Sequence, residues 1–169
     1  MKIGFIGLGI MGKPMAKNLL KAGYSIVAYD IVPEAVKELV QAGAEQGESS
    51  ADVASKSDII ITMLPNSPHV KEVVLGKNGV LEGAKSGTIL VDISSIAPLA
   101  SKEISEKLAE KGVVMLDAPV SGGAIGAHEG TLAVMVGGDA DAVEAARPVL
   151  ERLGTLVAHL GPVGAGTRA

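Results

Sequence analysis

Short apolar runs alternate with amphipathic stretches along most of the chain. The apolar runs predict β-strands at residues 2–6, 25–30, 58–64, 88–94, 113–120, 131–138 and 155–161. The stretches between them predict helices at residues 10–23, 33–43, 49–57, 67–76, 98–112 and 139–154. This alternation is typical of a doubly wound α/β fold of the Rossmann type, with a mostly parallel sheet and helices on both faces.

The pattern also predicts one domain followed by the start of another element. At 169 residues the chain is long enough to bury a hydrophobic core. No linker or change in composition appears before Gly161, so residues 1–161 are expected to form a single domain. The chain then ends with the glycine-rich sequence GPVGAGTRA, which is typical of a loop or of the approach to a further helix.

Composition narrows the class of protein. Hydrophobic residues make up 47% of the chain and charged residues 20%, which excludes a disordered or fibrous protein. Aromatic residues are scarce and the net charge is -4, and both argue against nucleic acid as a partner. The chain has no cysteine, so disulfides, thiolate metal sites and cysteine nucleophiles are excluded.

Neither a targeting segment nor a membrane segment is expected. The N-terminal sequence MKIGFIGLGIMGKP is apolar, but glycine interrupts it every two or three residues and it carries no cleavage site. No apolar run approaches the roughly 18 residues that a membrane helix needs. The expectation is a cytoplasmic protein without a membrane partner.

The sequence GLGIMG fits the dinucleotide-binding pattern G-x-G-x-x-G. It follows a predicted strand and opens a predicted helix, which is the context that the pattern requires. In such a site the first glycine permits a tight turn, the second lets the backbone approach the pyrophosphate, and the third lets helix and strand pack closely. The alternative is a glycine-rich turn that binds nothing. The predicted cofactor loop comprises Gly7, Leu8, Gly9, Ile10, Met11 and Gly12.

Asp30 ends the next predicted strand, 18 residues beyond Gly12. A carboxylate at this position can accept hydrogen bonds from the hydroxyl groups of the adenosine ribose. It would also repel a 2′-phosphate, and the next residue is Ile31 rather than an arginine. The sequence therefore favours NAD over NADP as the cofactor. A solvated acid at the end of a strand is the alternative for Asp30.

The sequence FIGLGIMGKPMAKNL, at residues 5–19, closely resembles the signature of the β-hydroxyacid dehydrogenases. Further segments that resemble this family follow in order, namely MLPNSPHVKEV (63–73), VDISSIAP (91–98), DAPVSGG (117–123), GTLAVMVGG (130–138) and GPVGAG (161–166). The resemblance covers the whole chain. MLPNSPHVKEV and SSIAPLAS are most similar to the members that reduce tartronate semialdehyde to glycerate, so the resemblance implies this reaction with NADH.

The resemblance implies further contacts at the carboxyl edge of the sheet, where ligands bind in open α/β folds. Met63, Leu64 and Pro65 would lie along the nicotinamide half of the cofactor. Ser94 and Ser95 would contact the nicotinamide ribose and the carboxylate of the substrate. A helix-capping or turn-forming hydroxyl is the alternative for both serines.

Ser121, Gly122 and Gly123 also follow a predicted strand, and the resemblance implies that they bind a small carboxylate substrate. A hydroxyl group and exposed backbone N–H groups can hold a carboxylate or polarise a carbonyl oxygen. A plain glycine turn is the alternative. The histidines are scattered without ligand spacing, so we expect no metal site and no catalytic histidine.

The resemblance also implies that the family's proton donor and second domain are missing from these residues. Hydride transfer to a carbonyl needs a proton donor near the forming alkoxide. The family supplies a lysine in the pattern G-x-G-x-x-x-K, which opens a long helix leading into a second, all-helical domain. Here the pattern starts at Gly164 and Gly166 and stops at Ala169. Residues 162–169 are therefore expected to begin this interdomain helix, with the lysine and the helical partner domain absent.

Several alternatives stay open. The chain alone is expected to bind NAD but to be nearly inactive, and apolar surface left uncovered would favour a homo-oligomer. A stand-alone or engineered nucleotide-binding module without catalysis is one alternative. A dehydrogenase of the same family acting on 3-hydroxyisobutyrate or another β-hydroxyacid is a second. The short-chain dehydrogenases, which use Tyr-x-x-x-Lys, are disfavoured because Tyr24 and Tyr29 are followed four residues later by Ala28 and Pro33.

Overall fold

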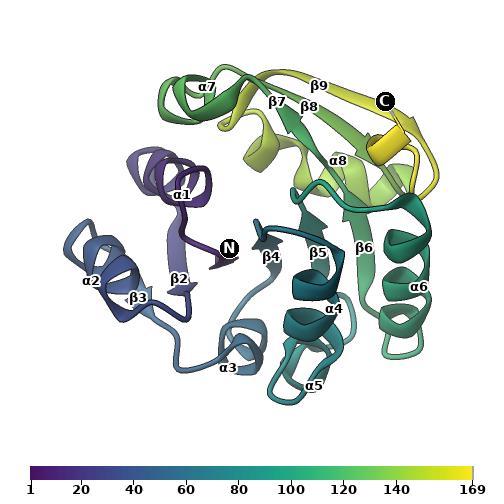
Figure 1. The fold of residues 1–169 in the computed structure, drawn as a ribbon, viewed down its shortest axis with the longest axis horizontal. Helices are drawn as coiled ribbons and strands as arrows, with labels where there is room; N and C mark the ends of the chain where they lie inside the picture. Colours follow the sequence, from purple (N-terminus) through teal and green to yellow (C-terminus); the bar gives the residue numbers. More distant parts are fainter. Residues whose placement is uncertain (169) are drawn as a thin grey trace.

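The fold is a twisted, mostly parallel sheet with helices on both faces (Figure 1). The computed structural model describes residues 1–168. Along the sheet the strands follow the order β3 (Glu45–Gln46), β2 (Ser25–Tyr29), β1 (Lys2–Ile6), β4 (Ile59–Thr62), β5 (Ile89–Asp92), β6 (Val114–Asp117), β8 (Leu132–Gly137) and β7 (Val120–Ser121), and β9 (Gly154–Gly161) also pairs with β8. Among the strand pairs of the described residues, only those of β8 with β6 and β7 are antiparallel. The predicted doubly wound fold is confirmed.

Two hydrophobic layers separate the helices from the sheet. One layer contains side chains of α1 (Gly12–Lys21), α2 (Pro33–Gln41), α7 (Gly123–Glu129) and α8 (Ala140–Leu150). The other contains side chains of α3 (Ser50–Ser55), α4 (Ser67–Leu75), α5 (Val80–Gly83) and α6 (Pro98–Ala109). Neighbouring residues of one strand enter opposite layers, as Ile59 and Ile60 do in β4. This arrangement explains why the central strands are apolar on both faces.

The register of the central strands aligns their carboxyl ends in one row. Ile6 pairs with Tyr29 on one side and with Thr62 on the other. The row continues from Thr62 to Asp92 and from Asp92 to Asp117. The residues that follow each strand are therefore brought to one edge of the sheet, although they are far apart in the sequence.

The structure corrects several predicted boundaries. The strand predicted at residues 113–120 is broken, because Pro119 has no N–H group to donate and the chain turns there to pair with β8. The helix predicted from residue 10 begins at Gly12, which leaves Ile10 and Met11 in the loop. The short elements β3, α5 and α7 are not predicted by the sequence pattern, since two to seven residues carry too little periodicity.

Candidate functional site

The glycine loop between β1 and α1 is shaped by close backbone contacts. Gly7 has a φ of +101°, and a Cβ atom there would meet the carbonyl oxygen of Met63. A Cβ atom on Gly12 would meet the carbonyl oxygen of Gly7. These two glycines are therefore required by the fold itself, as expected for a tight turn with close helix packing.

The contacts within the protein do not require glycine at position 9, unlike at Gly7 and Gly12. A Cβ atom built on it meets nothing within 4 Å, and its φ is not in the left-handed region. Its backbone instead borders the groove that opens above the loop. A glycine that the protein's own packing does not require is explained by close approach of a ligand to the backbone.

The N-terminus of α1 opens onto the same groove. The helix has ten residues and no acidic residue in its first turn. Its unpaired N–H groups and positive dipole end therefore face the loop without a neutralising side chain. Together with the space above Gly9, this arrangement fits the pyrophosphate of a dinucleotide.

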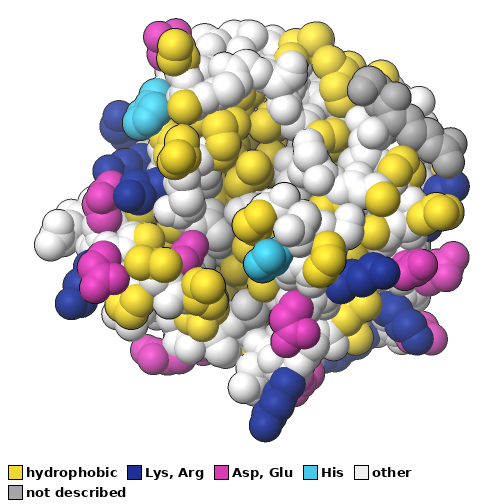
Figure 2. Space-filling model, viewed as in Figure 1, with side chains coloured by type: hydrophobic (Ala, Val, Ile, Leu, Met, Phe, Trp, Pro, Cys, Tyr) yellow, Lys and Arg dark blue, Asp and Glu magenta, His cyan; other side chains and the backbone are white. Residues whose placement is uncertain are grey.

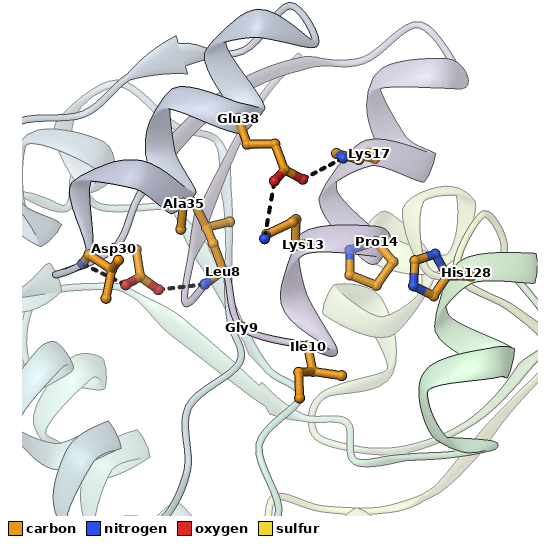
Figure 3. Close-up of a pocket in the computed structure, with 11 residues that line it drawn as sticks. Leu8, Gly9, Ile10, Lys13, Pro14, Lys17, Asp30, Ala35, Glu38 and His128 are labelled. Atoms are coloured by element: carbon orange, nitrogen blue, oxygen red, sulfur yellow. Dashed lines mark hydrogen bonds and ion pairs between the residues drawn. The ribbon is translucent and has the colours of Figure 1, made fainter.

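Asp30 connects the glycine loop to the turn that follows β2 (Figure 3). Its Oδ2 atom accepts a hydrogen bond of 2.7 Å from the N–H of Leu8, and its Oδ1 atom accepts one of 2.8 Å from the N–H of Val32. An ionised carboxylate offers about four acceptor positions, so both oxygens can still accept from ribose hydroxyl groups. Asp30 thus fixes the shape of the loop, while its predicted ribose contact remains a prediction.

The groove above the glycine loop has a volume of about 440 Å³. One wall is the glycine loop with Tyr29, Asp30 and Ile31, and the other is the turn after β4 with residues 63–65 and part of α4. Figure 2 shows hydrophobic side chains gathered around a hollow that lies between α1, α7 and α4. An apolar groove with a polar carboxylate at one side suits a flat, partly charged ligand.

A second cavity, of about 300 Å³, lies farther along the same sheet edge. It brings together the hydroxyl-bearing residues Ser95, Ser121 and Thr167. Apolar and glycine residues complete its lining, namely Ile96, Pro119, Val120, Met135 and Gly166. Gly122 and Gly123 both have positive φ angles and turn the chain from β7 into α7, so glycine is required at both positions.

Comparison with known proteins identifies the family. Residues 2–161 match the family described as the NAD binding domain of 6-phosphogluconate dehydrogenase. The chain belongs to this family. The glycine loop, the N-terminus of α1 and Asp30 lie within this NAD-binding domain, and the predicted cofactor NAD is confirmed. The assignment of these residues to the cofactor stays a prediction.

The relatives of this NAD-binding domain are β-hydroxyacid dehydrogenases. The chain is 50% identical over 165 residues to an NAD-dependent L-serine dehydrogenase of Pseudomonas aeruginosa, which covers 98% of this chain and 55% of that protein. It is 48% identical over 167 residues to the mitochondrial 3-hydroxyisobutyrate dehydrogenase of Mus musculus, covering 99% of this chain and 50% of that protein. The chain thus spans about half the length of these relatives.

The structure of Mycobacterium tuberculosis 3-hydroxyisobutyrate dehydrogenase with L-serine superposes with a TM-score of 0.93 at 38% identity. The match covers 99% of this chain and 56% of that one. The predicted resemblance to the β-hydroxyacid dehydrogenases is therefore confirmed for the NAD-binding domain. In addition, no described helix of this domain combines the length and the apolar character that a membrane span would require.

Ser94 contacts the turn after β4, whereas Ser95 lines the second cavity. The Ser94 side chain is fully buried, and its Oγ atom accepts a hydrogen bond of 2.8 Å from the N–H of Leu64. It therefore supports the turn at residues 63–65, which borders the groove above the glycine loop. Of the two predicted serines, Ser95 is the one that the structure leaves exposed.

Asp92 is a buried acid of the NAD-binding domain that the sequence analysis misses. Its Oδ1 atom accepts hydrogen bonds from the Thr62 hydroxyl, at 2.9 Å, and from the Ser94 N–H, at 3.2 Å. Its Oδ2 atom has no hydrogen-bond partner among the described residues. Burial raises the pKa of this carboxyl to about 6, and the nearby charge of Asp117 adds to the increase. A lone acid within an apolar strand is the sequence signal that could have indicated it.

Asp117, to which the sequence analysis assigns no role, holds the chain segment that walls the second cavity. Its carboxylate is fully buried. Oδ1 accepts a hydrogen bond of 2.7 Å from the N–H of Gly164, and Oδ2 accepts one of 3.0 Å from the N–H of Thr167. A short 3₁₀ turn, η1 (Gly166–Arg168), begins within this segment. The prediction that a long interdomain helix starts here remains a prediction.

The histidines occupy separate places in the domain. The Nδ1 atom of His69 lies 2.7 Å from the side-chain oxygen of Asn66. His128 lines a cavity between α1 and α2 (Figure 3). The Nε2 atom of His159 lies within hydrogen-bond distance of the carbonyl oxygens of Gly138 and Gly161, so this nitrogen is the protonated one. Within residues 1–168 no three His, Asp or Glu side chains are grouped in a way that could hold a metal ion.

Proposed function

We propose that this chain is the cofactor-binding part of an NAD-dependent dehydrogenase that acts on the β-hydroxyl group of a small hydroxy acid. The observation that carries the proposal is the placement of two neighbouring sites on one sheet edge. The groove above the glycine loop, which we propose as the NAD groove, lies at the ends of β1, β2 and β4. The cavity with Ser95 and Ser121 lies beyond β5 and β6. A cofactor and a small second molecule would thus be held side by side.

Different parts of the chain would have separate tasks. The glycine loop and the N-terminus of α1 would hold the pyrophosphate, and Asp30 would hold the adenosine ribose. NAD, when bound, supplies the acceptor for a hydride from the hydroxyl carbon. The hydroxyl groups of Ser95 and Ser121 would hold the substrate carboxylate and so direct the hydroxyl carbon toward the groove.

The substrate class follows from the size of the second cavity and from the relatives. A cavity of about 300 Å³ suits a molecule of a few carbon atoms. L-Serine and 3-hydroxyisobutyrate, named for the relatives, both carry a hydroxyl group on the carbon β to a carboxylate. Glycerate, the product of the tartronate semialdehyde reaction that the sequence analysis favours, shares this feature. We propose the class as a whole, with L-serine and 3-hydroxyisobutyrate as its first candidates.

The proton of the reacting hydroxyl group would be transferred to a residue that does not line this cavity. None of the described residues that line the cavity has a side chain that titrates near neutral pH. We therefore propose that the 169 residues bind NAD but turn over substrate slowly or not at all.

The proposal is tested by calorimetric titration of the purified chain with NAD and NADH, followed by an assay of NADH formation. The assay uses L-serine, 3-hydroxyisobutyrate and glycerate, with the chain alone and with the longest product of its reading frame. Binding by the chain, with turnover only in a longer product, supports the proposal. Binding without turnover in any product would favour a nucleotide-binding module without catalysis, and absence of NAD binding would overturn the proposal.

A further inference from the structure

A third cavity, of about 530 Å³, lies between α1 and α2 on the far side of Asp30 from the NAD groove. The two cavities share Gly9, Ile10, Asp30 and Val32 in their linings, so they meet at the glycine loop. Figure 3 shows Glu38 of α2 pointing toward Lys13 and Lys17 of α1, with Asp30 apart from this group. We call the part of the cavity with the two lysines and Glu38 its back, and the part with Asp30 its front.

The position of Asp30 indicates what would reach into this cavity. An acid at the end of the second strand of an NAD-binding domain binds the 2′-hydroxyl group of the adenosine ribose. Because Asp30 lines the cavity, a substituent on the 2′ oxygen would enter it. The cavity is therefore the place where the chain meets the 2′-phosphate that distinguishes NADP from NAD.

The back of the cavity contains two ammonium groups that share one carboxylate as their ion-pair partner. The Nζ atom of Lys17 lies 2.6 Å from Oε2 of Glu38, and the Nζ atom of Lys13 lies 3.3 Å from Oε1 of the same residue. Hydrogen bonds from Lys17 and then Lys13 lower the pKa of Glu38, so the carboxylate is ionised at neutral pH. Without Glu38, two flexible ammonium groups would be free to bind a phosphate.

We propose that Glu38 is a specificity-determining residue that keeps this cavity from binding a 2′-phosphate. Asp30 repels the phosphate at the front of the cavity, and Glu38 holds away from it the two lysines that would otherwise attract it. This inference rests on the NAD-binding part of the proposed function. It requires no catalytic activity, so it can be tested on the 169-residue chain.

If Glu38 had a purely structural role, its replacement would change folding stability rather than NADP affinity. The three side chains are partly exposed, at 33%, 36% and 43% for Lys13, Lys17 and Glu38. Ion pairs with this exposure contribute little to folding stability. The Glu38→Gln substitution should therefore leave the fold and NAD affinity intact, and its effect should appear in NADP affinity alone.

The test is calorimetric titration of wild type and Glu38→Gln with NAD and with NADP. We expect NADP affinity to rise about 3- to 10-fold in the variant, with NAD affinity within about twofold of wild type. The gain should shrink as salt is added, because the ammonium groups are exposed to solvent. Adding Lys13→Met and Lys17→Met to Glu38→Gln should abolish it, since the gain depends on those two groups.

Glu129→Gln is the matched control. It removes the same charge beside His128, but Glu129 makes no ion pair with Lys13 or Lys17 among the described residues. An unchanged ratio of NADP to NAD affinity in Glu38→Gln, or an equal change in Glu129→Gln, would overturn the inference and leave the proposed function standing. Failure of the wild type to bind NAD would overturn both.

Discussion

The three glycines of the glycine loop differ in whether contacts within the protein require them. Gly7 and Gly12 are fixed by contacts with the protein's own backbone, whereas Gly9 borders open space. The G-x-G-x-x-G spacing, together with the predicted strand and helix around it, indicated a tight turn at Gly7 and close packing at Gly12, because the motif is local in the sequence. The difference between these two glycines and Gly9 depends on tertiary contacts, such as that of Gly7 with Met63, which the motif does not contain.

Replacing Gly9 and Gly12 by alanine should separate binding from folding. Gly9→Ala should leave the free energy of unfolding within about 1 kcal/mol of wild type, and NAD affinity should fall about tenfold or more, because the new methyl group enters the space for the pyrophosphate. Gly12→Ala should lower the free energy of unfolding by about 1–3 kcal/mol, because its methyl group meets the carbonyl oxygen of Gly7. Urea unfolding and calorimetry measure the two quantities. Equal destabilisation by both variants would contradict this division.

Asp92 should make stability depend on pH in an unusual direction. Its pKa in the folded chain, about 6, lies above its ordinary value of 3.8, so the folded state binds the proton more tightly than the unfolded state does. The stability associated with this group is therefore fully present below about pH 4 and is lost as the pH rises through about 6. At about 1.4 kcal/mol per pKa unit, the loss is roughly 3 kcal/mol.

The measurement is urea unfolding of wild type and Asp92→Asn at several pH values between about 4 and 7. The variant cannot ionise at this position, so its stability relative to wild type should increase as the pH rises over this range. Comparing the two proteins cancels the contribution of surface acids such as Glu38 and Glu45, whose lowered pKa values act in the opposite direction. A constant difference between the two proteins would show that folding does not raise the pKa of Asp92.

At the scale of elements, the sequence predicts long periodic segments well and short connections poorly. Except for β3 and α5, the strands from β1 to β6 and the helices between them follow local hydrophobic patterns. The contacts of Asp92 and Asp117 could not be predicted in the same way, because their partners lie 30 and about 50 residues away. The register of β4 and β5 brings Asp92 to Thr62. The pairs of β6 with β8 and of β8 with β9 bring the segment after Gly161 beside Asp117.

The contact of β6 with the C-terminal segment gives a prediction at this scale. Asp117→Asn keeps the size of the side chain but replaces one of the two acceptor oxygens by an N–H donor, which would face the N–H of Gly164 or Thr167. The lost hydrogen bond leaves a buried donor unpaired and should lower stability by about 1–3 kcal/mol. Hydrogen exchange of residues 162–168 should become faster, while NAD affinity should stay the same because the groove is lined by other elements.

Asp141→Asn is the control for this experiment, because Asp141 is an exposed acid of α8. It should leave the exchange of residues 162–168 unchanged. Faster exchange across the whole chain in Asp117→Asn would instead indicate general destabilisation, and the role of Asp117 as a specific clamp of this segment would then be rejected.

At the scale of the whole molecule, the sheet joins the two walls of the proposed NAD groove to the proposed substrate cavity. One wall comes from β1, α1 and β2, and the other from the turn after β4 and from α4. The same sheet continues through β5 and β6 to the cavity that Ser95 and Ser121 line. A ligand in the groove would therefore contact residues from several strands of one continuous sheet.

This continuity predicts that NAD stabilises the entire domain in a single step. Thermal unfolding of the chain should show one cooperative transition, and NAD at about 100 times its dissociation constant should raise the free energy of unfolding by about 2.7 kcal/mol. Gly9→Ala, titrated at the same NAD concentration, should show a much smaller increase, because the affinity rather than the fold is changed. If the region from β1 to β4 unfolded independently, scanning calorimetry would resolve two transitions, of which NAD would shift only the first. The hydrophobic layers on both faces of the sheet argue for one transition, since each layer contains side chains from β1, β2, β4, β5 and β6.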